Sequence, residues 1–240
     1  MSFIDKVFSY VNYLKGLRRL LKKYRRTYRN YFDVIFKDVR RKYPFQVILK
    51  NGSRITVLTR AGLVSIAEIT DYDKVYYDID SNMWTISNLQ FAPQITTLKI
   101  RSDIDNGEIV PIFMQNIYGE IPVEGKVVID IGANVGDSCI YFALKGASNV
   151  IGLEPFRKGY EFARENIREN NLSNKISVLL AGCASMTGDL IVDPNYPSTL
   201  SSRLVEGSEG IKIPLLTLEQ IIEKNKLGSR EIVLKMDCEG

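Results

Sequence analysis

Residues 127–137 constrain the fold more than any other part of this chain. An apolar run with one carboxylate, Asp130, leads into Gly132 and Gly136, and an apolar helical pattern begins directly after them. A buried strand that enters a tight loop and then the N-terminus of a helix is where α/β proteins bind nucleotides. The stretch therefore predicts an α/β domain with a ligand site after its first strand.

A second acid points to the kind of ligand. Glu154 ends another apolar run, residues 150–153, and follows Asp130 by 24 positions. A carboxylate about 20 residues past a glycine loop is placed to accept hydrogen bonds from ribose hydroxyls. We therefore expect an adenosine-containing small molecule at this site.

From residue 126 onward, strand-like and helix-like patterns alternate, which predicts a parallel sheet with right-handed crossovers. An additional pair of strands is expected at 188–192 and 211–214. The expected strands of the sheet are 127–131, 149–153, 176–181 and 231–236, and the expected helices are 137–145, 156–171 and 216–226.

The preceding part, residues 45–101, has the pattern of antiparallel strands. Asn51-Gly52 lies between two apolar runs, 45–49 and 54–58, and this dipeptide tolerates the positive φ of a hairpin turn. A second hairpin is expected over 74–87, and a short, partly helical segment over 108–118. The sequence thus predicts three parts: an arm at 1–43, a β-rich segment at 44–107 and the α/β domain at 108–240.

The arm is strongly basic. Residues 1–42 hold 13 Lys and Arg against 3 acids, a net charge of +10, whereas the rest of the chain carries −6. Apolar residues recur with a period of 3.5 over 7–35, which predicts one long helix that ends at or before Tyr43, because Pro44 follows. Its apolar seam can pack on the body, lie on the anionic inner surface of a membrane, or mediate self-association. Nucleic acid is disfavoured because the tyrosines lie on the seam and not among the basic residues.

The composition excludes several kinds of site. The chain has no histidine, which rules out a histidine base and histidine-ligated metals. Cys139, Cys183 and Cys238 lie far apart and predict neither a disulfide framework nor a zinc site. No apolar run approaches the roughly 18 residues of a membrane span, and the first residues lack a signal-peptide core. We therefore expect a cytoplasmic protein without a bound metal.

The glycine loop distinguishes between two kinds of cofactor. Dinucleotides need a glycine where this chain has Asn134, because a pyrophosphate approaches the backbone there. Asp130 adds a negative charge that repels phosphate but favours an ammonium group. Both features favour S-adenosylmethionine, which has a cationic end and no phosphate, over a nicotinamide cofactor. In this interpretation Asp130 attracts the ammonium group and Glu154 binds the ribose.

The same residues resemble the FkbM-type S-adenosylmethionine-dependent methyltransferases, which have the Rossmann-like class I fold. The resemblance covers roughly residues 108–240. Its most specific element is the end of the fourth strand, which is similar to the family's signature of a lysine, an acid and a Glu-Gly pair. The matching stretches are 128–138, 151–156, 166–170 and 234–240.

The resemblance implies which residues hold the cofactor. In such enzymes these are the loop after strand one, the acid after strand two, the residues after strand three and the acid that closes strand four. The implied cofactor-binding residues are therefore Asp130, Gly132, Asn134, Gly136, Asp137, Glu154, Pro155, Ala184, Ser185 and Asp237.

The resemblance also implies the reaction, a methyl transfer to a hydroxyl oxygen of a sugar, a glycan or a secondary metabolite. An alcohol is a poor nucleophile, so a general base assists. Asp237 is the first candidate for this base and Glu239 the second. Glu239 could instead be a structural partner of a backbone amide or of Lys235.

The sequence ends at Gly240, just after the fourth expected strand. The class I sheet has the strand order 3-2-1-4-5-7-6, so three strands of the implied domain are missing. We expect strand 231–236 to be an exposed edge although its residues are apolar on both faces. A chain of this kind is expected to be aggregation-prone and to bind cofactor weakly. The alternative is a catalytically inactive binding or assembly module.

Overall fold

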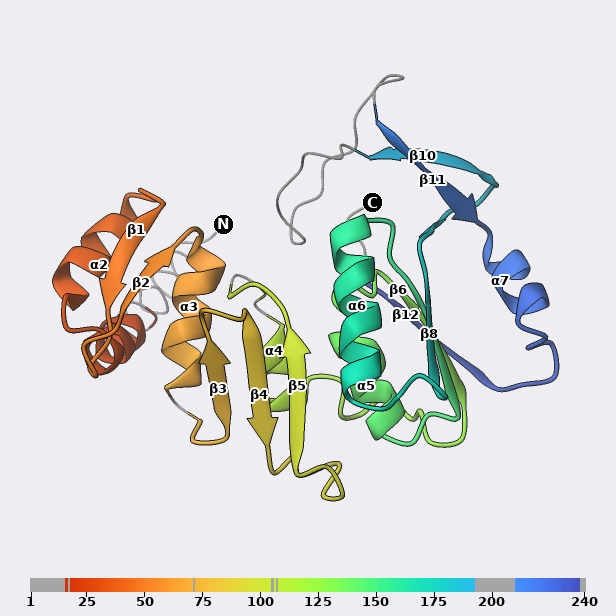
Figure 1. Cartoon of the computed structure of the whole chain (residues 1–240), viewed down its shortest axis with the longest axis horizontal. Coiled ribbons are helices and arrows are strands. Elements are labelled where there is room, and N and C mark those ends of the chain that lie inside the picture. Colours follow the sequence, from red (N-terminus) through yellow and green to blue (C-terminus); the bar gives the residue numbers. More distant parts are fainter. Residues whose placement is uncertain are drawn as a thin grey trace, which may run out of the picture. The chain divides into compact units, whose positions relative to one another are not determined.

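The computed structural model describes residues 16, 18–70, 72–104, 106, 108–192 and 210–237. The chain divides into two compact units, Met1–Asp73 and Lys74–Gly240 (Figure 1). The boundary between the units lies inside the segment 44–107, and the expected division into three parts stays a prediction. Among the described residues, no helix is both long and apolar enough to cross a membrane.

The first unit contains helices and one hairpin. Residues 18–27 are helical, and the remaining elements are α2 (Tyr31–Val39), β1 (Phe45–Ile48), β2 (Arg54–Val57) and α3 (Arg60–Ile69). The hairpin predicted around Asn51-Gly52 is confirmed, with Val47 opposite Ile55. The helix α3 was not expected. It begins after Thr59, whose side chain accepts a hydrogen bond from the backbone N–H of Gly62.

The prediction of one long helix in the arm is wrong for the described residues. The helix stops at Thr27, and Tyr28 forms a β-bridge with Leu49 before α2 begins. The backbone N–H of Arg29 donates to the carbonyl of Ile48 at 2.7 Å, so the chain pairs with the hairpin where a helix would continue. The expected seam also includes residues before position 16 and Leu17, which lie outside the described residues.

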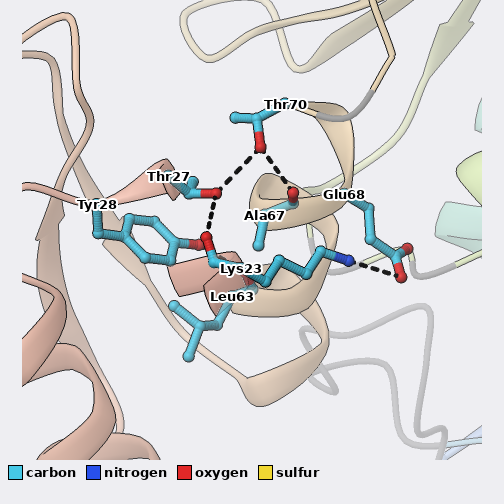
Figure 2. Close-up of polar contacts among 7 residues, drawn as sticks. All are labelled: Lys23, Thr27, Tyr28, Leu63, Ala67, Glu68 and Thr70. Atoms are coloured by element: carbon cyan, nitrogen blue, oxygen red, sulfur yellow. Dashed lines mark hydrogen bonds and ion pairs between the residues drawn. The ribbon is translucent and has the colours of Figure 1, made fainter. Parts of the chain in front are cut away.

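The first helical segment is held to α3 by polar contacts at its inner face. Tyr24 and Tyr28, both on the predicted seam, are fully buried, so this part of the seam packs inside the unit. Three of the contacts join Thr27 to Thr70 at 3.0 Å between hydroxyls, the Tyr28 hydroxyl to the carbonyl of Leu63 at 2.6 Å, and Lys23 to Glu68 at 3.3 Å. Figure 2 draws these residues and marks the first and third contacts with dashed lines.

The second unit begins with an antiparallel sheet in the order β3-β4-β5, followed by a short helix. The expected second hairpin is confirmed as β3 and β4, which turn at Asn82 with φ of 51°. The third strand, β5, pairs with β4 and lies at an edge. These elements are β3 (Val75–Asp78), β4 (Met83–Ser87), β5 (Thr97–Arg101) and α4 (Ile109–Phe113).

A four-stranded parallel sheet follows, in the order β12-β6-β7-β8. This is the order expected for the first four strands of a class I sheet, and every predicted strand is present within two residues at each end. The elements are β6 (Val127–Ile131), α5 (Asp137–Leu144), β7 (Asn149–Leu153), α6 (Arg157–Glu169), β8 (Ile176–Leu179), α7 (Leu218–Lys224) and β12 (Ile232–Met236). A small sheet, in the order β10-β11-β9, lies between β8 and α7 in the sequence: β9 (Gly182–Cys183), β10 (Gly188–Val192) and β11 (Ile211–Leu216).

Helices cover both faces of the parallel sheet, with α5 and α6 on one side and α7 on the other (Figure 1). Because side chains alternate along a strand, Ile129 and Ile131 lie in one hydrophobic cluster with Ile221 of α7, whereas Asp130 points to the α5 side, where it contacts Ser138 and Cys139. The sheet is therefore buried on both faces at β6. At the edge strand β12, as expected, Leu234 and Met236 are exposed, with relative accessibilities of 42% and 62%.

Candidate cofactor and active site

The ends of three parallel strands lie in one row at the carboxyl edge of the sheet. The register pairs Met236 with Ile131 and Ile131 with Leu153. The next residues, Asp237, Gly132 and Glu154, therefore lie at the same edge, and the backbone N–H of Asp237 donates to the carbonyl of Ile131 at 3.1 Å. Predicted residues from three separate stretches are thus brought to one place.

The glycine loop is tightly fixed between β6 and α5. Its turn needs left-handed backbone at Gly132, Asn134 and Gly136, whose φ angles are 83°, 45° and 81°. A side chain at Gly136 would meet the Cα and Cβ of Ala163 at 3.1 Å, so α6 packs directly on the loop. Asn166, also on α6, donates from its side-chain amide to the carbonyl of Val135 at 2.9 Å.

Glu154 joins the second strand to the loop. Its side chain is 5% exposed, and its two oxygens accept the backbone N–H groups of Asn134 at 2.7 Å and Phe156 at 2.9 Å. Burial raises the pKa of Glu154 to about 7, although these two hydrogen bonds lower it in part. The side-chain oxygen of Asn134 is also buried and has no hydrogen-bond partner among the described residues. Two buried acceptors thus lie at the loop, as a ligand with hydroxyl donors would require.

Asp130 is fully buried in the middle of an ion-pair network on the α5 side. Lys235, its neighbour on β12, lies 2.9 Å from one carboxylate oxygen. The other oxygen accepts hydrogen bonds from Ser138 at 2.5 Å and Cys139 at 3.2 Å. Burial and the nearby carboxylate raise the pKa of the Cys139 thiol well above its usual value, so Cys139 is not a nucleophile at neutral pH.

Asp137 holds a segment from outside the parallel sheet. One of its oxygens accepts from the amide of Asn106 at 3.1 Å, and the other accepts from the backbone of Ser138. Asn106 in turn accepts from the backbone N–H of Glu108. The pKa of Glu108 is raised by its own burial and by the carboxylates of Asp137 and Asp237, so Glu108 belongs to the same cluster of acids.

The remaining predicted residues are less closely connected to the loop. Pro155 is half-buried beside Glu154. Ala184 is half-buried and donates to the carbonyl of Leu216, and Ser185 is exposed. Asp237 is exposed at the end of β12, and Glu239 lies outside the described residues. The part of these residues in cofactor binding and catalysis stays a prediction.

Three residues of this cluster were not predicted as site residues: Lys235, which the sequence analysis placed only in the family signature, and Asn106 and Glu108. Lys235 could have been found, because aligning the ends of two parallel strands places it beside Asp130. Asn106 and Glu108 belong to no motif, and no sequence pattern indicated them.

Part of the chain is similar to known methyltransferases. The model of the methyltransferase FkbM domain matches residues 130–240. A methyltransferase FkbM from Methylobacillus flagellatus KT aligns with 17% identity and a TM-score of 0.35, over 51% of this chain and 28% of that one. The structure of PRMT6-SAH aligns with 35% identity and a TM-score of 0.25, over 27% of this chain and 19% of that one.

A putative RNA methyltransferase from Pyrococcus horikoshii aligns with 29% identity and a TM-score of 0.27, over 32% of this chain and 38% of that one. The chain thus spans well under half the length of these three solved relatives. Among the curated proteins, nothing matches the chain significantly.

Proposed function

Since residues 130–240 match the model of the methyltransferase FkbM domain, we propose that the chain binds S-adenosylmethionine at the glycine loop and transfers its methyl group to a hydroxyl oxygen. The observation that carries the proposal is the bond between Glu154 and the backbone of Asn134. It joins the predicted ribose acceptor to the loop that follows β6. The acceptor molecule is proposed to be a sugar, a glycan or a secondary metabolite.

The hydrogen-bond acceptors at this edge fit the ribose hydroxyls of an adenosine cofactor. Glu154 accepts one hydrogen bond on each oxygen from the protein, which leaves further lone pairs for ribose hydroxyls. The unpartnered oxygen of Asn134 offers another acceptor beside them. The sulfonium of S-adenosylmethionine supplies an electrophilic methyl group when the cofactor is bound. The role of the loop is to hold this end in place, because alignment of the reacting atoms can account for much of a rate enhancement.

Asp237 is the proposed general base. It follows β12 at the same edge as Gly132, and its exposed position leaves it accessible to an acceptor. With the cofactor bound, Asp237 would accept the proton that the acceptor hydroxyl releases when its oxygen is methylated. Glu239 is the second candidate for this role.

Calorimetric titration of S-adenosylmethionine tests the proposal. We expect the unaltered chain to bind it and Glu154→Gln to weaken binding by about 10- to 100-fold, since hydrogen bonds to a charged group contribute about 1.5–3 kcal/mol. The matched control is Glu161→Gln on α6, an exposed glutamate that pairs only with Arg157 among the described contacts. If the unaltered chain binds no S-adenosylmethionine, the alternative of an inactive binding or assembly module is favoured.

A second candidate function concerns the first unit. Phe32, Phe36 and Val39 follow one another by four and three positions along α2, and their exposures are 72%, 52% and 65%. This helix therefore presents an apolar stripe outward. The guanidinium of Arg40 lies 3.9 Å from the centre of the Phe36 ring, and residues 40–42 are all basic and largely exposed. We propose that this surface contacts an anionic membrane peripherally, because an apolar stripe beside cations suits that surface.

Flotation with vesicles separates the possible occupants of this surface. We expect the full chain to bind vesicles that contain phosphatidylserine, and the triple variant Phe32→Ser, Phe36→Ser, Val39→Ser to lose most of that binding. Vesicles of phosphatidylcholine alone should bind weakly. Self-association that is lost in the triple variant, without any vesicle binding, would show that the stripe joins two copies of the chain and would contradict the membrane proposal.

A further inference from the structure

The structure pairs Asp130 with a cation that belongs to the chain itself. Asp130 and Lys235 are direct neighbours on adjacent parallel strands, and both side chains point to the same face of the sheet. Their exposures are 0% and 9%. One oxygen of Asp130 accepts hydrogen bonds from Ser138 and Cys139. The other lies in the ion pair with Lys235 and accepts no hydrogen bond among the described residues.

Lys235 remains charged at neutral pH. Burial alone would lower the pKa of Lys235, but the adjacent Asp130 carboxylate raises it above the usual value of a lysine. A buried carboxylate without a partner is very unfavourable, and a paired one has little net charge left to attract another cation. An ammonium group from a cofactor would also be repelled by Lys235 at this position.

Lys235 has a second contact that reaches the loop. Its ammonium group donates to the carbonyl of Gly132 at 3.1 Å. The backbone N–H groups of Gly132 and Ala133 both donate to the carbonyl of Leu153. The first turn of the loop is therefore fixed from β7 on one side and from β12 on the other.

We infer that Lys235 is a positioning residue, which neutralises Asp130 and holds the glycine loop, and that Asp130 does not bind the ammonium group of the cofactor. This inference rests on the proposed function, since it concerns how the chain binds S-adenosylmethionine. It replaces the direct role expected for Asp130 with an indirect one. It also gives Lys235 on β12 a task beside a site for a cationic ligand, namely to neutralise the buried Asp130.

A double-mutant cycle on the full chain tests the inference, with Asp130→Asn, Lys235→Met and the combination of both. Two ligands are titrated: S-adenosylmethionine and 5′-methylthioadenosine, which has the same adenosine part but no ammonium group. We expect Lys235→Met to lower the unfolding temperature and to weaken binding of both ligands by a similar factor of about tenfold or more. The matched control is Lys212→Met, an exposed lysine of β11 in an ion pair with Asp189.

The combined variant is the decisive one. The combined variant has no unpaired carboxylate at position 130, so it should be more stable than Lys235→Met. The ratio of its Kd for S-adenosylmethionine to its Kd for 5′-methylthioadenosine should stay within about threefold of the same ratio in the unaltered chain. A ratio that changes by more than tenfold would show that Asp130 binds the ammonium group, and would overturn the inference. So would unaltered stability and binding in Lys235→Met.

Failure of the proposed function has a different signature. The unaltered chain would then bind neither ligand, whereas the coupling between the two substitutions in the unfolding temperature would still show whether Lys235 neutralises Asp130. Absence of that coupling would overturn the inference whatever the ligand results.

Discussion

The side-chain amide of Asn166 pairs with the backbone of Arg101 in the way that a neighbouring strand would. Asn166 accepts the N–H of Arg101 at 2.7 Å and donates to its carbonyl at 3.0 Å. Asn170 repeats the pattern with the N–H and carbonyl of Lys99, at 3.0 and 2.6 Å. Four helical residues rise about 6 Å and two strand residues about 6.6 Å, so the two spacings match. The edge of β5 is thereby covered by α6.

Asn166 also connects this edge to the glycine loop through Val135. We expect Asn166→Leu, a change to a similar volume, to destabilise the second unit by about 2–4 kcal/mol, because the buried carbonyl of Val135 and the part-buried backbone groups of Arg101 lose their partners. It should also weaken S-adenosylmethionine binding. Asn170→Leu is the control at a less buried position and should cost about 1 kcal/mol. If both variants lose the same free energy of unfolding in denaturant, the additional bond from Asn166 to Val135 contributes nothing to stability, which would contradict this prediction.

The raised pKa of Glu154 makes cofactor binding depend on pH. Burial raises this pKa from 4.5 to about 7, and ribose hydroxyls donate best to the ionised form. Since the ionised fraction falls about tenfold per pH unit below the pKa, the Kd for S-adenosylmethionine should be about tenfold higher at pH 6 than at pH 8. Glu154→Gln should remove most of this dependence. A wild-type Kd that is constant over this range would show that Glu154 is ionised throughout, or does not contact the cofactor.

The same pKa has an opposite consequence for the free protein. A carboxyl whose folded-state pKa lies above its unfolded value favours folding below the unfolded pKa, here about 4.5, and this contribution is lost as the pH rises through about 7. We therefore expect the ligand-free chain to lose stability from this group between pH 4.5 and 7, in the range where its affinity for cofactor increases. Thermal unfolding of wild type and Glu154→Gln over this range measures the difference.

Gly152 has no room for a side chain. It is the neighbour of Asp130 on β7, and a Cβ there would lie 2.8 Å from the sulfur of Cys139 and 3.0 Å from the Cβ of Ala133. We expect Gly152→Ala to cost about 1–3 kcal/mol, because α5 and the loop must move away from the strand. Gly228→Ala is the control, since nothing lies within 4 Å of a Cβ at that position. Similar unfolding free energies for the two variants would show that α5 can move without cost.

The parallel sheet was predictable because its signals are local. The strands β6 and β7 are short apolar runs bounded by acids and glycines, and a run of this kind has few other interpretations. The register then follows, because parallel strands end at one edge, and it places Lys235 beside Asp130. The pairing of Asn166 with Arg101 was not predictable in the same way. Its partner is a backbone 65 residues away, and the sequence of a strand does not indicate what covers its edge.

The first unit shows the opposite case. The apolar seam continues with the same period through Tyr28, so a continuous helix was the natural prediction. The break occurs because Tyr28 and Arg29 bond to the hairpin, and such a tertiary contact overrides local preference. In α3 the local signal was present, with Thr59 as a cap and Leu63, Ile66 and Ala67 as an apolar face. It was missed because the surrounding segment was interpreted as β-rich throughout.

Asp38 is the polar centre of the first unit. Its carboxylate is 4% exposed, accepts the hydroxyl groups of Tyr24 at 3.0 Å and Tyr43 at 2.7 Å, and lies 3.3 Å from the guanidinium of Arg60. Burial and the Asp38 carboxylate raise the pKa of Tyr24 above its usual range, so this hydroxyl remains a donor at any moderate pH. Three groups from separate parts of the unit thus depend on one side chain.

Removal of that side chain should leave several buried groups without partners. We expect Asp38→Ala to destabilise the first unit by about 3–5 kcal/mol, as for other broken buried networks. Asp33→Ala on the same helix is the control. Asp33 forms an exposed pair with Lys37 one turn away, and such pairs contribute about 0.3–0.5 kcal/mol. Each variant removes one aspartate side chain from α2. If their free energies of unfolding in denaturant differ by less than about 1 kcal/mol, the two tyrosines and Arg60 find other partners when Asp38 is absent.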